Sequence, residues 1–175
     1  MIRPEFRKIL TDQRGAAVIL WSFFTIAIVV YLVIARHLLS DPDFGRGFAY
    51  AGMARAALWI LALVDLAYYF HWKKTNLTPE AILRDANKGK MLRALDAHKG
   101  RIEERAAGVV STYVTRRVVL FAIIEAIAVY GLVLALVGRY LIDLYMLSAL
   151  ALVLLILEFP AEKPFLAVLQ RAEHK

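Results

Sequence analysis

Two acidic residues lie inside long apolar runs of this sequence. Asp65 stands within residues 48–72 and Glu125 within residues 118–137. A charged side chain in a lipid bilayer is costly unless it is paired, so each acid is a candidate functional residue. Two adjacent carboxyl groups cannot easily both ionise, and one of them then holds a proton, as a proton relay or a cation site requires.

Both acids are expected at the same depth in a membrane. Asp65 precedes Trp72 by seven residues and Glu125 follows Val118 by seven, which places each acid about 10 Å from the same boundary at the rise of an α-helix. One interpretation is a shared proton or cation site. The structural alternative is that each acid is protonated and bonded to a serine, a tyrosine or a backbone carbonyl on a neighbouring helix, where it only holds helices together.

A second pair, Arg55 and Asp143, is predicted near the opposite boundary. These residues stand at similar estimated depths in the second and fourth apolar runs. An intramembrane ion pair is the favoured interpretation. The alternative is that either side chain extends outward to the headgroups.

No metal site, cofactor or catalytic motif is expected. The chain has no cysteine, and its four histidines are scattered over different segments without the spacing of metal ligands: His37, His71, His98 and His174. It has no glycine-rich phosphate loop, no zinc-protease helix motif and no nucleophile elbow. We therefore expect that the protein is not an enzyme.

Four apolar runs position these side chains. The chain has 175 residues, of which 61% are hydrophobic, and a mean hydropathy of +0.59. An α-helix needs about 20 apolar residues to cross about 30 Å of hydrocarbon, and its backbone groups are satisfied within the helix. The predicted fold is therefore all-α, a single polytopic membrane domain over residues 1–175 with four transmembrane helices. The predicted spans are residues 15–35, 48–72, 118–137 and 140–159.

The distribution of Lys and Arg predicts the orientation of the spans. Eighteen of these residues lie on one side, in the two terminal segments and in residues 73–117, and three lie on the other, namely Arg36, Arg46 and Arg139. Because basic flanks stay in the cytoplasm, both termini and residues 73–117 are expected to be cytoplasmic. The net charge of +7 then reflects this orientation, and the basic residues are expected to attract the anionic headgroups of the lipid bilayer. No nucleic acid is expected as a partner.

The cytoplasmic loop, residues 73–117, is expected to be helical. Thr78 is a good N-cap and Pro79 fits the first helical position, so a helix is predicted over residues 79–88.

A second loop helix is predicted over residues 91–115, continuous with the third span. Its apolar residues, among them Leu95 and Ile102, recur at three or four residues. Such a stripe indicates packing on the membrane surface or on neighbouring helices, or recognition of a partner protein. Residues 2–10 show similar spacing, which predicts either a short surface helix or a flexible tail.

The second half of the chain carries a set of local features in a fixed order. An apolar helix contains Glu-Ala and Tyr-Gly-Leu-Val, a tight turn follows, and the next helix ends in Phe-Pro. These features are Glu125-Ala126, Tyr130 to Val133, Gly138-Arg139 and Phe159-Pro160. In this respect residues 115–165 resemble a group of small bacterial four-span inner-membrane proteins. The resemblance implies a bacterial inner-membrane location and no established activity.

A more local pattern surrounds Glu125, where an acid in an apolar helix is followed shortly by Tyr130 and Gly131. Residues 121–138 are similar here to the ion-carrying helix of rotary ATPase proteolipids (subunit c). That resemblance implies that Glu125 carries a proton or a sodium ion. The chain departs from the family in its four spans, in its polar loop and in the absence of a glycine-rich helix, which argues against a ring subunit.

The function expected from the sequence is that of a non-enzymatic integral membrane protein. It acts in assembly or interaction, as an accessory subunit of a membrane complex, with other membrane subunits or further copies of itself as partners. The alternative is a proton- or cation-conducting element built on Asp65 and Glu125.

The first testable prediction concerns orientation. Reporter tags at either terminus or within residues 75–110 are expected to be protected from externally added reagents, because the basic residues hold these segments in the cytoplasm. Labelling of intact cells checks this, with lysed cells as the positive control. A tag at any of these places that reacts in intact cells would contradict the orientation.

Overall fold

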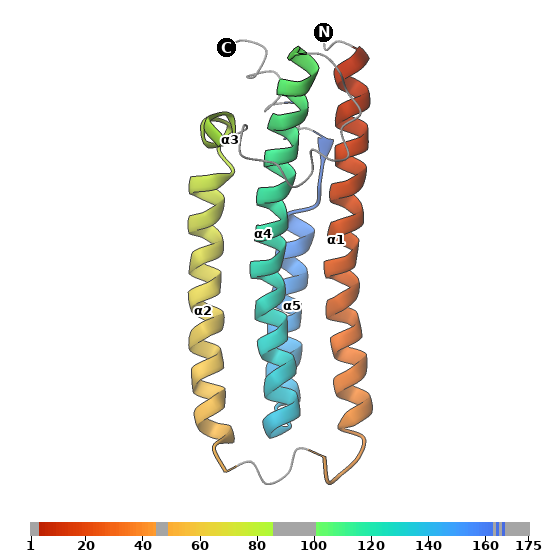
Figure 1. Ribbon diagram of the computed structural model, residues 1–175. Helices are drawn as coiled ribbons and strands as arrows, with labels where there is room; N and C mark the ends of the chain where they lie inside the picture. Colours follow the sequence, from red (N-terminus) through yellow and green to blue (C-terminus); the bar gives the residue numbers. More distant parts are fainter. Residues whose placement is uncertain (1–3, 45–48, 86–100, 163, 165, 167–175) are drawn as a thin grey trace. The chain divides into compact units, whose positions relative to one another are not determined.

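The computed structural model describes residues 4–44, 49–85, 101–162, 164 and 166. Its elements are five helices, shown in Figure 1, and the predicted all-α class is confirmed. The helices are α1 (Pro4–Leu38), α2 (Ala51–Asn76), α3 (Pro79–Asp85), α4 (Arg101–Gly138) and α5 (Leu141–Leu157).

Among the described residues, three helices are long and apolar enough to cross a membrane. They cover Thr11–Leu38, Ala51–Asn76 and Gly108–Gly138. The fourth predicted span contains the shorter apolar helix α5, whose 17 residues extend about 26 Å, at the lower limit for a span. The three long helices indicate a membrane location.

Large apolar side chains on the outside of these helices agree with that location. Phe23 on α1, Ile60 on α2 and Ile142 on α5 are 67%, 61% and 72% exposed. In water such a surface would be an aggregation hazard, whereas in hydrocarbon it costs nothing.

The loop helices lie partly within the described residues. α3 begins at Pro79 as predicted, and the backbone N–H of Ala81 donates to Thr78 Oγ1 at 3.4 Å. Residues 86–100, which include Leu95 and His98, lie outside the described part of the chain. From residue 101 the chain is helical, and α4 continues into the third apolar run without a break.

At the other end of the chain, α1 begins at Pro4 and is one continuous helix as far as Leu38. Residues 4–14 are therefore the first turns of the helix that contains the first apolar run. They form neither a separate surface helix nor a flexible tail.

The chain forms two compact units. Unit 1 contains Met1–Trp21, His71–Leu120 and Phe159–Lys175, and unit 2 contains Ser22–Phe70 and Phe121–Glu158. Three helices, α1, α2 and α4, contribute residues to both. Unit 2 holds all five charged residues that the sequence places inside apolar runs, namely Arg55, Asp65, Glu125, Asp143 and Glu158.

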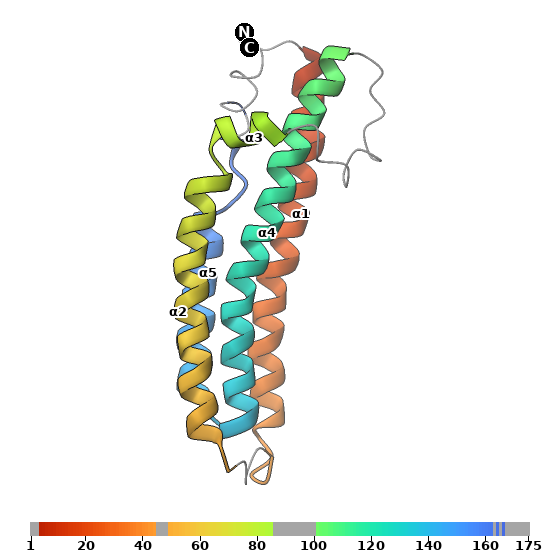
Figure 2. The ribbon, with the colours of Figure 1, turned by 60° about the vertical axis from the view of Figure 1, so that its left-hand side comes forward.

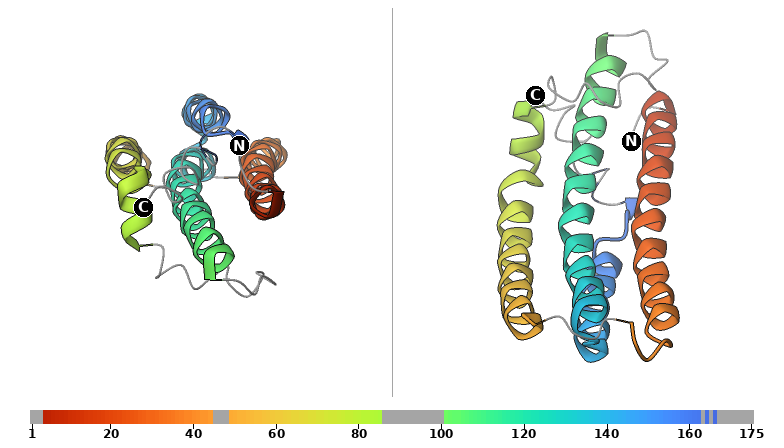
Figure 3. Two further views of the ribbon diagram at one scale, coloured as in Figure 1. Left: turned by 90° about the horizontal axis from the view of Figure 1, so that it is seen from above. Right: turned by 60° about the horizontal axis from the view of Figure 1, so that its bottom comes forward.

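Within unit 2, the second half of α4 occupies the central position. It lies between α1 and α2 in Figures 1 and 2, and Figure 3 shows α5 on a third side. The share of buried residues agrees, at 44% in the apolar stretch of α4 against 11% in those of α1 and α2. On α4, Phe121 packs against Phe24 of α1 with ring centroids 5.9 Å apart.

Gly131 allows α4 and α5 to approach closely. A Cβ atom at Gly131 would lie 3.1 Å from the Cα of Leu144 and 3.2 Å from the Cβ of Leu147. Ala128 and Ala135, one turn away on either side, are fully buried. Small residues on this face of α4 therefore set the distance to α5, as is typical of helix pairs in membranes.

Arg139 joins the turn between α4 and α5 to the segment that follows α1. Its backbone has a φ of 57°, a left-handed conformation that is uncommon for a side-chain-bearing residue. Its guanidinium donates to four carbonyls: Leu39 at 2.8 Å, Asp41 at 2.9 Å, Pro42 at 3.0 Å and Phe44 at 2.9 Å. Arg139 thus satisfies carbonyls of the non-helical segment just after α1.

We expect Arg139→Lys to lower the free energy of unfolding by about 1–3 kcal/mol, because one ammonium cannot replace the bonds of a planar guanidinium. Titration of the protein from mild detergent into a denaturing detergent measures this. The control is Arg36→Lys, since Arg36 is exposed at the end of α1. Arg139→Gly relieves the left-handed backbone, so a glycine variant more stable than the wild type would contradict the role of the side-chain bonds.

Candidate functional site

Each acid predicted to lie deep in an apolar run is bonded to a tyrosine of another helix. Tyr31 of α1 donates to Glu125 Oε1 of α4 at 2.6 Å. Tyr130 of α4 donates to Asp65 Oδ2 of α2 at 2.7 Å. Each acid is thus bonded to a tyrosine on a neighbouring helix, which is the arrangement expected if the acids hold helices together. A proton or cation site shared by the two acids stays a prediction.

A third bond of the same kind joins α2 to the end of α5. Tyr69 donates to Glu158 Oε1 at 2.7 Å, and the two residues are 2% and 5% exposed. Sequence reasoning missed this pair, because Glu158 stands at the end of its apolar run, where an acid gives no signal of burial. The available signal was weak: an acid directly before Phe159-Pro160, and a tyrosine near the end of the second apolar run.

Arg55 and Asp143 lie in direct contact, as an ion pair between α2 and α5. Arg55 Nε lies 2.7 Å from Asp143 Oδ2, and Arg55 Nη2 donates to Oδ1 at 3.0 Å. This is the two-point geometry that makes arginine and carboxylate a strong pair. The Asp143 side chain is 2% exposed and that of Arg55 is 49% exposed, with the guanidinium carbon 4.8 Å from the ring centroid of Tyr140.

Together these four contacts connect all the long helices of unit 2. They join α1 to α4, α4 to α2, and α2 to α5 at two levels. A hydrogen bond between helices in a membrane contributes on average about 0.6 kcal/mol, whereas a buried polar group without a partner costs more than that. The contacts therefore select which helices are neighbours, and at which rotation, more than they supply stability.

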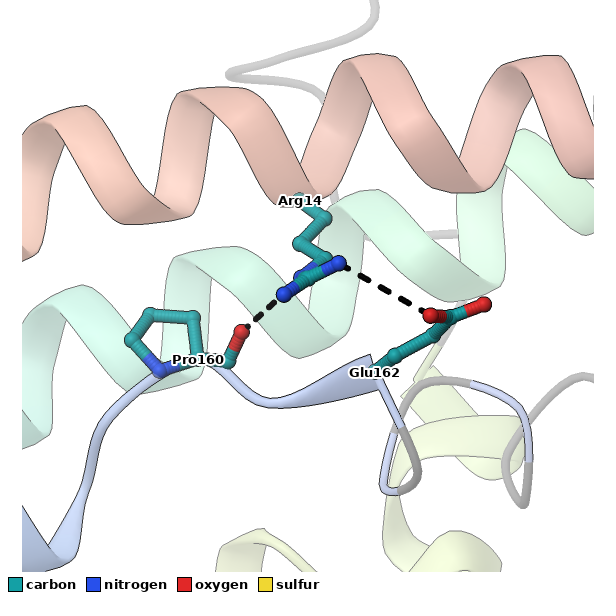
Figure 4. Close-up of polar contacts among 3 residues, drawn as sticks. All are labelled: Arg14, Pro160 and Glu162. Atoms are coloured by element: carbon teal, nitrogen blue, oxygen red, sulfur yellow. Dashed lines mark hydrogen bonds and ion pairs between the residues drawn. The ribbon is translucent and has the colours of Figure 1, made fainter.

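Unit 1 contains a separate set of polar contacts around Arg14, drawn in Figure 4. Arg14 Nε donates to the carbonyl of Pro160 at 3.1 Å, and Arg14 Nη1 lies 3.8 Å from Glu162 Oε2. Trp21 packs edge-on against Phe159 with ring centroids 5.1 Å apart. The segment after α5 is therefore held against the first half of α1 through Phe159, Pro160 and Glu162.

The end of α2 is joined to α4 within unit 1 as well. Trp72 Nε1 donates to the carbonyl of Arg116 at 3.3 Å, and Arg116 Nη1 donates to the carbonyl of Asn76. This reciprocal pair satisfies a carbonyl at the last turn of α2.

In the described parts of the chain, no group of three or more histidine, cysteine, aspartate or glutamate side chains could hold a metal ion. His37 and His71 are exposed. His98 and His174 lie outside the described residues. The four contacts of unit 2 described above are bonds between helices.

A double-mutant cycle on Tyr130 and Asp65 tests this interpretation. We expect Tyr130→Phe, Asp65→Asn and the double variant to reveal a coupling energy of about 0.6–1.7 kcal/mol in unfolding titrations. Tyr145→Phe is the control, because Tyr145 is half-exposed on α5. A coupling energy indistinguishable from zero would show that the bond does not help to hold α4 against α2.

Comparisons with models of protein families, with curated proteins and with solved structures give no match to this chain. The two resemblances seen in the sequence therefore stay predictions.

Proposed function

We propose that this chain is a non-enzymatic integral membrane protein that acts in the assembly of a membrane complex, as an accessory subunit. In this proposal α1, α2, α4 and α5 all cross the bilayer, and both termini and residues 73–117 lie on the cytoplasmic side. The membrane is a bacterial inner membrane. The partners are other membrane subunits or further copies of the chain.

One observation carries the proposal. Each of the five charged residues inside the apolar runs is bonded to a side chain of another helix: Arg55, Asp65, Glu125, Asp143 and Glu158. Charges in membrane helices most often mark a pathway or hold helices together. Here they bond to tyrosine or to each other, which supports the second role.

The length of α5 and the distribution of basic residues support the four-span arrangement. α5 has 17 residues, and about 17 is the shortest span in common use. Only two residues, Arg139 and Tyr140, separate α4 from α5. A tight turn between two apolar helices is typical of adjacent spans that run in opposite directions.

Purification in mild detergent tests the assembly role. The tagged protein, expressed at its natural level, is expected to migrate in native gels far above the 19.7 kDa of one chain, together with defined partner subunits or as a closed oligomer. An unrelated four-span protein with the same tag is the control for detergent mass. A monodisperse monomer without partners in several mild detergents would contradict the proposal.

A proton- or cation-conducting element is the second candidate. It is favoured by the partial exposure of Asp65 and Glu125, which are both of intermediate burial. A tyrosine hydroxyl donates to one oxygen of each acid, and in this candidate function the second oxygen of the acid takes the proton or the cation.

The choice between the two candidates depends on the proton of Glu125. Glu125→Gln keeps the acceptor oxygen for Tyr31 but cannot release a proton, whereas Glu125→Leu removes the acceptor as well. For a structural acid we expect Gln to be tolerated and Leu to lower the unfolding free energy by about 1–3 kcal/mol. Assembly assays and proton-flux assays in vesicles decide, and loss of flux in a fully assembled Gln variant would favour the ion carrier.

A further inference from the structure

The guanidinium of Arg55 uses only one of its edges inside the protein. Arg55 Nε lies 2.7 Å from Asp143 Oδ2, and Arg55 Nη2 donates to Asp143 Oδ1 at 3.0 Å. A guanidinium has five N–H donors in one plane, and these contacts occupy two of them. Within the described residues Arg55 makes no further hydrogen bond or ion pair. The three other donors, on Nη1 and on the second side of Nη2, form an outward edge that faces away from Asp143.

This outward edge is exposed and held in one orientation. The side chain of Arg55 is 49% exposed, whereas that of Asp143 is 2% exposed, so the bonded edge lies inside unit 2 and the outward edge at its surface. The guanidinium carbon lies 4.8 Å from the ring centroid of Tyr140, and this stacking restricts the plane of the group. Gly52 stands three residues before Arg55 on the same side of α2. A Cβ atom there would meet no atom within 4 Å, so a ligand has room beside the edge.

Arg55 and Asp143 stand close to the ends of their helices. Arg55 is the fifth residue of α2 and Asp143 is the third residue of α5, which places them about 6 Å and about 3 Å from the starts of these helices. The headgroup layer is about 5–8 Å thick on each side of the hydrocarbon. Tyr50, directly before α2, is 65% exposed, as is typical of an aromatic residue at this layer. In the four-span arrangement proposed above, the outward edge is therefore within reach of phospholipid headgroups.

The donors of the outward edge need an acceptor of matching geometry. The exposed side chains of Met53 and Ile142, near the same helix ends, are apolar and supply none. An N–H group without an acceptor is costly at the edge of a bilayer. Phosphate oxygens fit best, because guanidinium and phosphate form two parallel bonds. Asp143 balances the charge of Arg55, so the edge recognises the phosphate group by its geometry rather than a lipid by its net charge.

We propose that the outward edge of Arg55 binds the phosphate diester of one phospholipid at the non-cytoplasmic ends of α2 and α5. Asp143 and Tyr140 hold the guanidinium in position. This site rests on the membrane insertion proposed above and goes beyond the assembly role. A phospholipid is favoured over inorganic phosphate because the apolar side chains near the edge, Met53 and Ile142, suit the acyl chains of a lipid. Zwitterionic and anionic phospholipids are both accepted, whereas lipids without phosphate are not.

Native mass spectrometry of the full-length protein measures this binding. Protein delipidated in mild detergent is titrated with phosphatidylcholine, with phosphatidylglycerol, or with digalactosyl diacylglycerol, a lipid without phosphate, all with the same acyl chains. We expect the two phospholipids to bind with similar affinity, each about tenfold more tightly than the galactolipid, because only they accept two bonds from the guanidinium. Inorganic phosphate is expected not to displace the phospholipid.

Two variants identify the residue that binds. Arg55→Lys keeps the charge beside Asp143 but has no second edge, and it is expected to lose the tenfold preference for phospholipid. Arg55→Leu/Asp143→Leu is expected to lose it as well, and this double variant leaves no unpaired charge. The matched control is Arg36→Lys, since Arg36 is an exposed arginine at the end of α1. Its preference should equal that of the wild type.

Equal affinity of the wild type for phospholipids and for the galactolipid would overturn the proposal, whether or not the variants fold. An unchanged preference in Arg55→Lys would overturn it too, because charge or another residue would then bind the phosphate. Binding of phosphatidylglycerol alone, or displacement by inorganic phosphate, would show an anion site instead of this lipid site. Flotation with vesicles tests the insertion separately. A protein that stays in solution without detergent would overturn the insertion, and the lipid site with it.

Discussion

The structure depends on one constraint, that a polar side chain inside an apolar helix must find its partner within the protein. Water satisfies such groups at the surface of a soluble protein, but hydrocarbon does not. In unit 2 the partners are found across helix pairs, with Asp143 on Arg55 and three carboxyl groups on tyrosines. A tyrosine hydroxyl satisfies a carboxyl oxygen without a second charge, which keeps the desolvation cost low.

This constraint explains the central position of the second half of α4. Glu125 accepts from α1, Tyr130 donates to α2, and Gly131 lets α5 approach on another face. One helix that makes three kinds of contact on three faces has little surface left for lipid. Among the side chains that the structure describes, the large exposed apolar ones accordingly lie mainly on α1, α2 and α5, with only Val119 on α4.

The polar contacts also connect the two candidate functions. A tyrosine can donate to a carboxyl oxygen whether the acid is ionised or protonated, so a structural acid and an ion-carrying acid share one geometry. The two kinds of acid differ in whether the carboxyl group releases and takes up a proton during function.

The all-α class and the helices around the first three apolar runs follow from the sequence alone, because hydrophobicity and helical length are local properties. Asp65, Glu125, Arg55 and Asp143 are visible in the same way, since a charge within an apolar run stands out. The partners of the two acids are not visible in the sequence, because Tyr31 and Tyr130 are ordinary residues of apolar helices. Two further contacts are hidden as well. Glu158 stands at the end of an apolar run, and nothing in the sequence indicates that Arg139 binds four carbonyls. Only the tertiary structure decides these pairings, because they depend on the rotation and axial shift of each helix, which side chains from several helices set together.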